Sequence, residues 1–352
     1  MHWILLPLAA ILAVLLSPGC QEQTAPQAAP QVTHRVLVST DLGGDPDDIQ
    51  SLYRLLQYSD VLKIEGIVSS PGPGAENAAD KIRHWIQRVD VDHLRRQGHT
   101  SLISEAEALS LVRQGLTTPG IPSAERRTEG SDWIIERAHA ADPEGLGRPL
   151  WVLAWGSITD VAQALHDDPS IAEKIRIYYV GSSNTVRDPE ARDYVFDGLN
   201  DKWPNLWAIE NGLLPRRSTD TFRGVYQGGE QSGEWGNQEF VHRNIRGHGT
   251  NHDGMFAEKA GDSFPLAESP AGTLKEGDSP SMLYLLSPVL GGVGDVDDPT
   301  QESWGGQFRH ADRANHPNYY IDISNDAEEC QRTVSKWRVQ FLSDWKERWD
   351  WY

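Results

Sequence analysis

Short apolar runs alternate with amphipathic segments along most of the chain, and this pattern predicts the secondary structure. The runs typical of buried β-strands are Val36–Val38, Leu62–Ser69, Pro149–Ala154, Ile175–Val180 and Leu206–Ile209. The segments typical of helices are Ile49–Leu56, Asn77–Val89, Ser104–Gln114, Ser131–Ala140, Ile158–Leu165, Met282–Leu286 and Val334–Trp349. Strands that alternate with helices predict an α/β fold with a doubly wound, mostly parallel sheet and helices on both faces.

The stretch from Arg35 to Leu56 joins the first predicted strand to the first predicted helix through an acidic, glycine-containing loop. Its aspartates are Asp41, Asp45, Asp47 and Asp48. Carboxylates this close repel one another, so a loop that folds with them inward requires a cation or protonation, and a hard divalent cation suits them. The alternative is that they cap a helix and lie in a solvated turn. An EF-hand is disfavoured because Leu52 stands where its bidentate Glu would fall, and a P-loop would need a Lys after the glycines.

These residues resemble a known family. Thr40-Asp41, followed by a glycine-containing turn and Asp47-Asp48, resembles the calcium-binding signature of the inosine/uridine-preferring nucleoside hydrolases. The longer segment TDLGGDPDDIQSLYRLLQYSD, with IEGIVSS after it, more closely resembles the nucleoside hydrolase-like domain of bacterial proteins catalogued as cellulose-binding. This resemblance extends from about Arg35 to the C-terminus and implies a single large nucleoside hydrolase-like domain.

The resemblance also implies which residues form the site. The implied calcium ligands are Asp41, Asp48, Asp278 and the main-chain carbonyl of Trp155. Asp41 would in addition accept a proton from the attacking water. Asp47 and Asn184 would bind sugar hydroxyls, and Trp304, in a Trp-Gly-Gly loop, would stack on a sugar. The alternatives are that Asp278 is a plain helix N-cap and Asn184 only a turn former.

The group that protonates the leaving base is the part of the site that departs from the family pattern. Nucleoside hydrolases usually carry a His just before the last calcium-binding Asp, and here Gly277 stands in its place. The segment 223–270 has no periodicity, and His248, His252 and Asp253 within it are the clustered candidates for a proton donor. A polar surface loop or a transition-metal site would explain the same residues.

Together these features predict a calcium-dependent hydrolase of N-glycosidic bonds, whose substrate is a nucleoside or a related ribosyl or glycosyl compound. Two alternatives stay open. One is a non-catalytic carbohydrate-binding protein of the cellulose-binding type, which the missing His favours. The other is an O-glycoside hydrolase that acts on polysaccharide fragments.

The N-terminal segment predicts export. Residues 1–20 resemble a lipoprotein-type signal peptide with Cys20 as the lipidated residue, and residues 21–33, rich in Gln, Pro and Ala, read as a disordered linker to the domain at 34–352. We therefore expect a membrane-anchored lipoprotein, periplasmic or at the cell surface, that meets the membrane only through this anchor.

Charge and cysteine content restrict the partners. The formal net charge of −19 disfavours nucleic acid polymers, because so acidic a chain repels phosphate backbones. The expected partner is a small nucleoside or sugar, and an oligomer is possible. Of the two cysteines, lipidation of Cys20 would leave Cys330 without an intrachain partner, so no disulfide framework is predicted.

Overall fold

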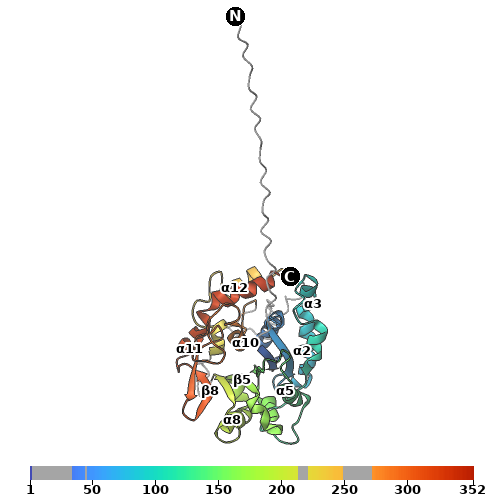
Figure 1. Cartoon of the computed structure of the whole chain (residues 1–352), viewed down its shortest axis with the longest axis vertical. Coiled ribbons are helices and arrows are strands. Elements are labelled where there is room, and N and C mark those ends of the chain that lie inside the picture. The colour runs from blue at the N-terminus through green and yellow to red at the C-terminus, as the bar shows by residue number, and fades with distance from the viewer. Residues whose placement is uncertain (2–33, 44–45, 213–220, 249–271) are drawn as a thin grey trace. The chain divides into compact units, whose positions relative to one another are not determined.

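A twisted sheet forms the centre of the molecule (Figure 1). The computed structural model describes residues 34–43, 46–212, 221–248 and 272–352, and within them the eight-stranded sheet has the order β3-β2-β1-β4-β5-β6-β8-β7. The strands are β1 (His34–Thr40), β2 (Leu62–Ser69), β3 (Val112–Arg113), β4 (Leu150–Ala154), β5 (Ile175–Val180), β6 (Trp207–Asn211), β7 (Phe308–Asp312) and β8 (His316–Asp322). Every neighbouring pair is parallel except β7 and β8, which are antiparallel.

Helices connect the parallel strands, as the crossover connections of such a sheet require. The α-helices of the described residues are α1 (Pro46–Gln57), α2 (Ala78–Val89), α3 (Val91–Arg96), α4 (Glu105–Ser110), α5 (Glu129–His139), α6 (Thr159–Asp167), α7 (Ser183–Arg187), α8 (Pro189–Asp197), α9 (Asn237–Asn244), α10 (Ser279–Leu286), α11 (Ala327–Ser335) and α12 (Arg338–Trp349), the last two of which follow the final strand. The predicted doubly wound α/β fold is therefore confirmed.

The two faces of the sheet bury two separate hydrophobic clusters, because side chains alternate along each strand. In β4, Trp151 and Leu153 join the cluster that holds α1, α2, α10 and α12, whereas Val152 joins the cluster of α5, α6 and α8. Figure 1 shows this arrangement, with α12 and α8 on opposite sides of β5. With both faces covered, the central strands carry apolar side chains on both faces beyond their first residues, which is why they appear in the sequence as apolar runs.

Three sequence predictions differ from the structure. The predicted helix at 104–114 ends at Ser110, and Val112–Arg113 instead pairs with β2 as an edge strand. The predicted closing helix at 334–349 is divided, since α11 ends at Ser335 and α12 begins at Arg338. The segment 223–270, predicted to be irregular, contains the helix α9, while its residues 249–270 lie outside the described ranges.

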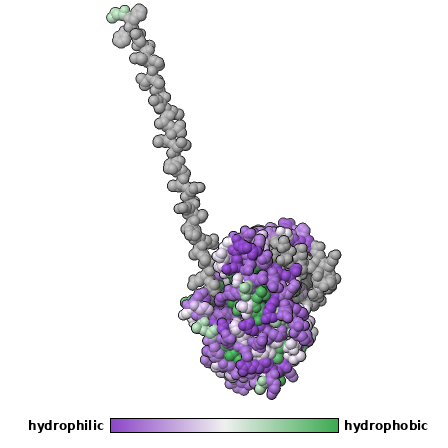
Figure 2. Space-filling model, turned by 90° about the vertical axis from the view of Figure 1, so that its right-hand side faces the viewer, coloured by the Kyte–Doolittle hydropathy of each residue, from purple (hydrophilic) through white to green (hydrophobic). Residues whose placement is uncertain are grey.

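The described surface is mainly hydrophilic on the face shown in Figure 2, with small hydrophobic areas. Large apolar side chains exposed by half or more include Ile121, Leu146 and Val339. None of the helices in the described ranges is both long and apolar enough to span a membrane. Residues 2–33, which hold nearly all of the predicted signal peptide, the cysteine predicted to be lipidated (Cys20) and the predicted linker, lie outside the described part of the chain.

Candidate functional site

Two predicted site residues, Asp41 and Trp155, lie at the carboxyl ends of neighbouring strands, as does Ser70. Asp41 directly follows β1, Ser70 follows β2 and Trp155 follows β4. The backbone joins these ends, because the amide of Ser70 donates to the carbonyl of Thr40 at 2.8 Å and the amide of Trp155 donates to that of Ser39 at 2.7 Å. The carboxyl edge of a parallel sheet is where such folds bind ligands.

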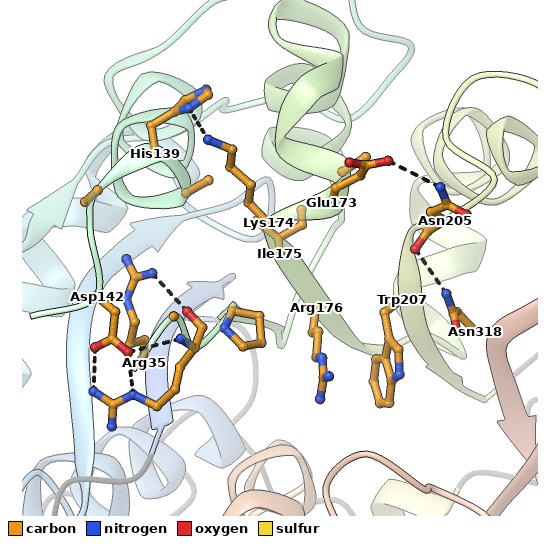
Figure 3. Close-up of a pocket in the computed structure, with 16 residues that line it drawn as sticks. Arg35, His139, Asp142, Glu173, Lys174, Ile175, Arg176, Asn205, Trp207 and Asn318 are labelled. Carbon is orange, nitrogen blue, oxygen red and sulfur yellow. Dashed lines mark hydrogen bonds and ion pairs between the residues drawn. The ribbon is translucent and has the colours of Figure 1, made fainter. Parts of the chain in front are cut away.

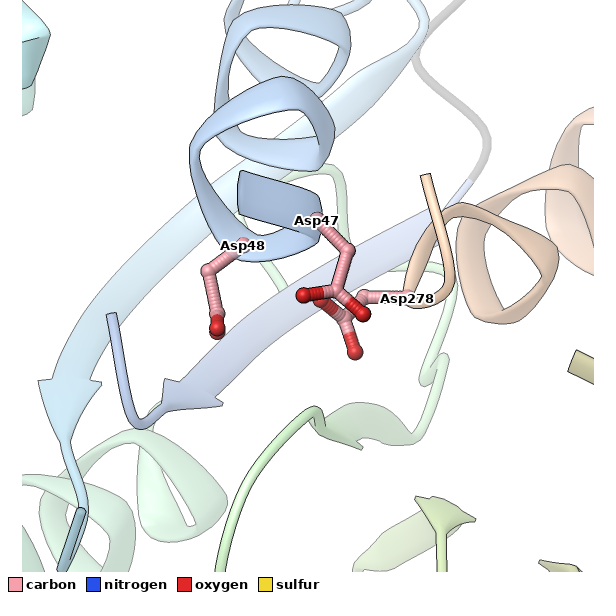
Figure 4. A group of neighbouring side chains, drawn as sticks. All are labelled: Asp47, Asp48 and Asp278. Atoms are coloured by element: carbon pink, nitrogen blue, oxygen red, sulfur yellow. The ribbon is translucent and has the colours of Figure 1, made fainter. Parts of the chain in front are cut away.

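An acidic cluster lies at this edge, where the N-termini of two helices meet. Asp47 and Asp48 are in the first turn of α1, and Asp278 is the N-cap residue of α10. Each contributes a carboxylate oxygen, and these oxygens all lie within 4.8 Å of one another (Figure 4). The positive ends of the two helix dipoles favour negative charge here, but only partly offset the repulsion among three carboxylates.

The Asp278 carboxylate takes part in this cluster and does not cap its own helix. The structure shows no hydrogen bond from the described amides that begin α10 to this carboxylate, although Asp278 occupies the N-cap position. The carboxylate lies beside that of Asp47, which comes from the other helix (Figure 4). This geometry distinguishes Asp278 from a plain N-cap residue.

Asp48 is oriented by the end of β1. The hydroxyl of Thr40 donates a short hydrogen bond to the Asp48 carboxylate and accepts one from the amide of Leu42. Asp48 is only 2% exposed. The Thr-Asp pair at the strand end therefore holds Asp48 in place, in addition to supplying Asp41.

Asp41 lies in a narrow space between two strand-end loops. A Cβ atom on Gly72 would be 2.5 Å from the Asp41 Cβ, and one on Gly156 would be 2.7 Å from both the Asp41 Cβ and Oδ1. Both positions therefore require glycine. The guanidinium of Arg187, on α7, lies 3.4 Å from Asp41 Oδ2, with its side chain 56% exposed. The acidic cluster consists of Asp47, Asp48 and Asp278 and does not include Asp41. Asp41 therefore stays a predicted ligand.

The structure brings Asn184 and the Trp155 carbonyl together at the ends of β4 and β5. The amide Nδ2 of Asn184 donates to the Trp155 and Val180 carbonyls, at 2.9 Å each. A carbonyl oxygen has two lone pairs, so this bond leaves the Trp155 oxygen able to bind a cation as well. The Trp155 indole is buried and donates to Ser281 Oγ at 2.8 Å, so it lies in the core and does not face a sugar.

The loop that carries Asp278 is fixed to α1 by buried polar contacts. Arg54 forms a two-bond ion pair with Glu276, at 2.7 Å for each bond, and both side chains are fully buried. Gln50 Oε1 accepts the amide of Lys275 at 2.7 Å, and Ser51 Oγ lies 2.9 Å from Ser279 Oγ. These contacts set the distance between the aspartates of α1 and Asp278.

The sequence analysis did not identify this frame of Gln50, Ser51, Arg54 and Glu276. One signal was present, because Arg54 is a charged residue within the apolar run Leu52–Leu56. A charge on the buried side of a helix requires a partner. Nothing in the neighbouring sequence of Arg187 indicated that its guanidinium would lie near Asp41.

Gly277 is in contact with the acidic cluster. A Cβ atom at this position would lie 2.5 Å from Asp47 Oδ2 and 3.4 Å from the ring of Phe222. The space that a side chain at position 277 would need is therefore occupied by the carboxylate of Asp47.

Two further predicted site residues lie away from the cluster. His248 Nε2 is 3.6 Å from Asp350, just past the end of α12. Arg348, two residues earlier, contacts Gln57 at the C-terminal end of α1, whereas Asp48 is in the first turn of that helix. Trp304 is 3% exposed and packs against Gly292, beyond the C-terminal end of α10. The other candidates, His252 and Asp253, lie outside the described residues.

A separate buried carboxyl group, Asp160, lies in the first turn of α6. It accepts hydrogen bonds from the amide of Leu116 and the hydroxyl of Thr128, at 3.0 and 2.9 Å. Burial raises the pKa of Asp160 to about 7, although these bonds and Arg126 act to lower it. Asp160 therefore links the start of α6 to the loop after β3. Its raised pKa means that the carboxyl group keeps a proton up to about neutral pH.

This pKa predicts a pH-dependent stability. The folded protein keeps a proton on Asp160 up to about pH 7, whereas an unshifted Asp loses it near 3.8. The stability that Asp160 contributes is therefore fully present below about pH 4 and is lost as the pH rises to about 7. Its size is about 1.4 kcal/mol for each unit by which the pKa of the folded protein exceeds that of the unfolded chain.

Replacement of Asp160 by Asn should remove this dependence. In urea unfolding at a series of pH values, we expect the parent to lose stability relative to Asp160→Asn between pH 4 and 7. Asp201→Asn, at an exposed site, is the control and should stay parallel to the parent. A constant difference between the parent and Asp160→Asn would contradict the raised pKa.

The topology of the sheet and an acidic site at its carboxyl edge define a protein of the nucleoside hydrolase-like fold class. Residues 35–308 match the family model described as "Cellulose-binding Sde182, nucleoside hydrolase-like domain", and the chain belongs to this family. No curated protein matches the chain.

Solved structures show the same fold. A nucleoside hydrolase-related hypothetical protein from Saccharophagus degradans, associated with carbohydrate metabolism, is 21% identical with a TM-score of 0.61, over 90% of this chain and 71% of that one. The plant nucleoside hydrolase PpNRh1 is 16% identical with a TM-score of 0.51, over 87% and 98% of the two chains. An inosine-guanosine nucleoside hydrolase is 13% identical with a TM-score of 0.50, over 88% and 99%.

Proposed function

We propose that this protein is a calcium-dependent hydrolase of N-glycosidic bonds, with a nucleoside or a related ribosyl or glycosyl compound as its substrate. The observation that carries this proposal is the cluster of Asp47, Asp48 and Asp278, whose oxygens lie within 4.8 Å of one another at the carboxyl edge of the sheet. Family membership and the nucleoside hydrolase-like fold support it.

The residues present fit a calcium ion. The available donors are carboxylate and carbonyl oxygens, which a hard cation of this size prefers, and the repulsion among the three carboxylates favours a divalent charge between them. The proposed ligands are Asp41, Asp48, Asp278 and the carbonyl of Trp155. When bound, the ion would orient a water molecule and the sugar hydroxyls.

The chain's own groups then have separate roles in the proposal. Asp41 accepts the proton of the attacking water. The close approach of Gly72 and Gly156 fixes the position of its carboxylate for this role. Asp47 and Asn184 bind hydroxyl groups of the sugar. The carboxylates also stabilise the positive charge that develops on the sugar ring in an oxocarbenium-like transition state.

A second candidate function is carbohydrate binding without turnover, and one observation favours it. Gly277 provides no proton donor for a leaving group, and the Asp47 carboxylate lies against that position. The family description also names cellulose binding. An O-glycoside hydrolase that acts on polysaccharide fragments is the third hypothesis, and a substrate panel distinguishes all three.

The test is a panel of nucleosides and O-glycosides incubated with the full chain, with and without EGTA. We expect at least one nucleoside to be hydrolysed in the presence of calcium and EGTA to stop the reaction. Turnover of O-glycosides alone would favour the third hypothesis. Binding of sugars with no turnover of any compound would favour the second.

The metal site is tested on the same samples by titration with calcium in a calorimeter. Asp48→Ala should abolish calcium binding, because it removes a central carboxylate of the cluster. Asp201→Ala, at an exposed position, should titrate like the parent. Equal calcium affinity in Asp48→Ala and the parent, with both folded by circular dichroism, would contradict the calcium site.

A further inference from the structure

Arg187 is an exposed cation at the acidic site, and the proposed function gives it no role. It is the last residue of α7, which follows β5 at the carboxyl edge of the sheet. Because β4 lies between β5 and β1, Arg187 reaches across the end of β4 to Asp41, which follows β1. The guanidinium is therefore placed beside a proposed calcium ligand, where its positive charge repels a metal ion.

The backbone that carries Arg187 is fixed on both sides. Asn184, three residues earlier, donates a hydrogen bond to the Trp155 carbonyl at 2.9 Å. Asp188, the next residue, is 1% exposed, and its carboxylate accepts a hydrogen bond from the hydroxyl of Ser157. Both contacts join α7 to the loop that follows β4, so the structure sets the point from which the Arg187 side chain extends.

The helix α7 also begins at a strained residue. Ser182, its N-cap residue, has a φ of 54° and a ψ of −113°, a conformation that residues other than glycine rarely adopt. The amide of Ser182 donates to the carbonyl of Gly212 at 2.9 Å. Strain of this kind persists only where the surrounding structure holds the chain, and it is concentrated at functional sites.

The contact between Arg187 and Asp41 is weaker than the buried arginine–carboxylate pairs of this protein. Nη1 of Arg187 lies 3.4 Å from Asp41 Oδ2, and the side chain is 56% exposed. Arg148, in contrast, donates two bonds to Asp142, at 2.8 and 2.6 Å, in the wall of a cavity at the opposite edge of the sheet (Figure 3). Charge-assisted bonds are usually about 2.7 to 2.9 Å long, and a longer, exposed pair contributes little energy.

Of the two partners in this contact, Arg187 is the one able to move. A Cβ atom on Gly72 would lie 3.0 Å from Asp41 Oδ2, and one on Gly156 would lie 2.7 Å from Oδ1, so the two loops enclose the carboxylate. The arginine side chain is long, flexible and exposed. A metal ion that binds Asp41 therefore displaces the guanidinium and leaves the carboxylate in place.

We propose that Arg187 is a resident counter-cation of Asp41 that calcium has to displace, and that its charge lowers the affinity of the site for calcium. The inference rests on the proposed function, since it takes Asp41 to be a calcium ligand. In the metal-free protein the guanidinium offsets part of the negative charge of the site, and in the loaded protein it repels the divalent ion. A site weakened in this way fills only where free calcium is plentiful, as do the weak calcium sites of extracellular modules.

The test is calorimetric titration of the full chain with calcium at low salt, in a series that changes the charge at position 187. Arg187→Gln removes the charge and should tighten calcium binding about five- to tenfold, whereas Arg187→Lys keeps the charge and should bind like the parent. Arg187→Glu reverses the charge and should bind more tightly than Arg187→Gln. A merely structural role would instead weaken binding in all three variants. Because salt screens charges, the difference between the parent and Arg187→Gln should narrow as salt is added.

Arg96→Gln is the matched control. Arg96 is 65% exposed and lies 3.6 Å from the carboxylate of Asp90, which follows the end of α2. Because α2 leads from the carboxyl edge of the sheet back to the opposite edge, this arginine is remote from the acidic site. Arg96→Gln should therefore bind calcium like the parent.

The outcomes separate this inference from the proposed calcium site. Equal or weaker calcium binding in Arg187→Gln, beside a parent that binds calcium, would overturn the role of Arg187 alone. Binding in Arg187→Lys as tight as in Arg187→Gln would also overturn it, because the charge would then not be the cause. Absence of calcium binding in the parent and in every variant would contradict the calcium site and this inference together. Asp48→Ala combined with Arg187→Gln should not bind calcium, and tight binding there would place the ion elsewhere and overturn the inference.

Discussion

Replacing Asp41 by asparagine is expected to lower turnover of the best substrate by about 10² to 10⁴, the usual contribution of a general base. Asparagine keeps the size of the side chain, so it fits beside Gly72 and Gly156, whose missing Cβ atoms leave room for residue 41. It also keeps an oxygen that can bind a cation. It cannot accept the proton of the attacking water, and turnover should therefore fall much more than affinity for the free sugar.

The measurement compares the rate of hydrolysis with the affinity for the sugar, in the parent, Asp41→Asn and the exposed control Asp201→Asn. A matching fall in rate and in affinity would show that Asp41 contributes to binding and not to the chemical step. Equal rates in all three proteins would remove Asp41 from the mechanism.

Replacing Glu276 by glutamine is expected to lower the free energy of unfolding by about 3 to 5 kcal/mol, because the variant leaves a charge buried without its partner. Burial opposes the charged form of Arg54, yet the charge and hydrogen bonds of Glu276 outweigh it and raise the pKa of Arg54 above its usual value. Arg338 is affected as well. Burial lowers its pKa to about 10, and Glu276 is the nearby charge that counteracts this shift.

Urea unfolding of three variants tests this prediction. Asp80→Asn removes one partner of the exposed Arg83–Asp80 pair and should cost less than about 1 kcal/mol. The double variant Arg54→Met with Glu276→Leu removes both charges and should recover much of the lost stability. A cost for Glu276→Gln as small as that of Asp80→Asn would show that the buried pair does not hold the Asp278 loop.

Much of the fold was predictable because its strands and helices are long enough to show their period. The strands at 62–69 and 175–180 and the helix that ends at Val89 have the predicted limits, within one residue. Where the prediction failed, a long-range contact decided the structure. Val112 pairs with Ile67 of β2, and this pairing has no signal in residues 104–114.

The break between α11 and α12 has a similar cause. Arg338 donates hydrogen bonds to the carbonyls of Val225 and Trp235, more than a hundred residues away in the sequence. Apolar residues recur at helical spacing on both sides of this break, so periodicity alone predicts one continuous helix. The core role of the helix was nevertheless correct, since Phe341 and Trp345 are fully buried.

In the candidate site, local sequence motifs identified residues at the ends of strands and at the starts of helices. They did not predict which side chains the whole fold would bury. Asp48 and Asp278 lie together in the structure as ligands of one predicted ion should. Trp304 was predicted to stack on a sugar because its Trp-Gly-Gly loop resembles a loop of the related domain, and the fold buries this indole in the core. His248 remains a predicted proton donor, although its contact is with Asp350.

The contact between Gly277 and Asp47 couples these two positions. A side chain introduced at position 277 would meet the Asp47 carboxylate, whose oxygen lies 2.5 Å from the Cβ position. This oxygen is the end of a flexible side chain, so it can turn aside, but it then leaves the group of three carboxylates. The two positions are therefore epistatic, because a substitution at 277 alters the acidic cluster even when residue 47 stays an aspartate.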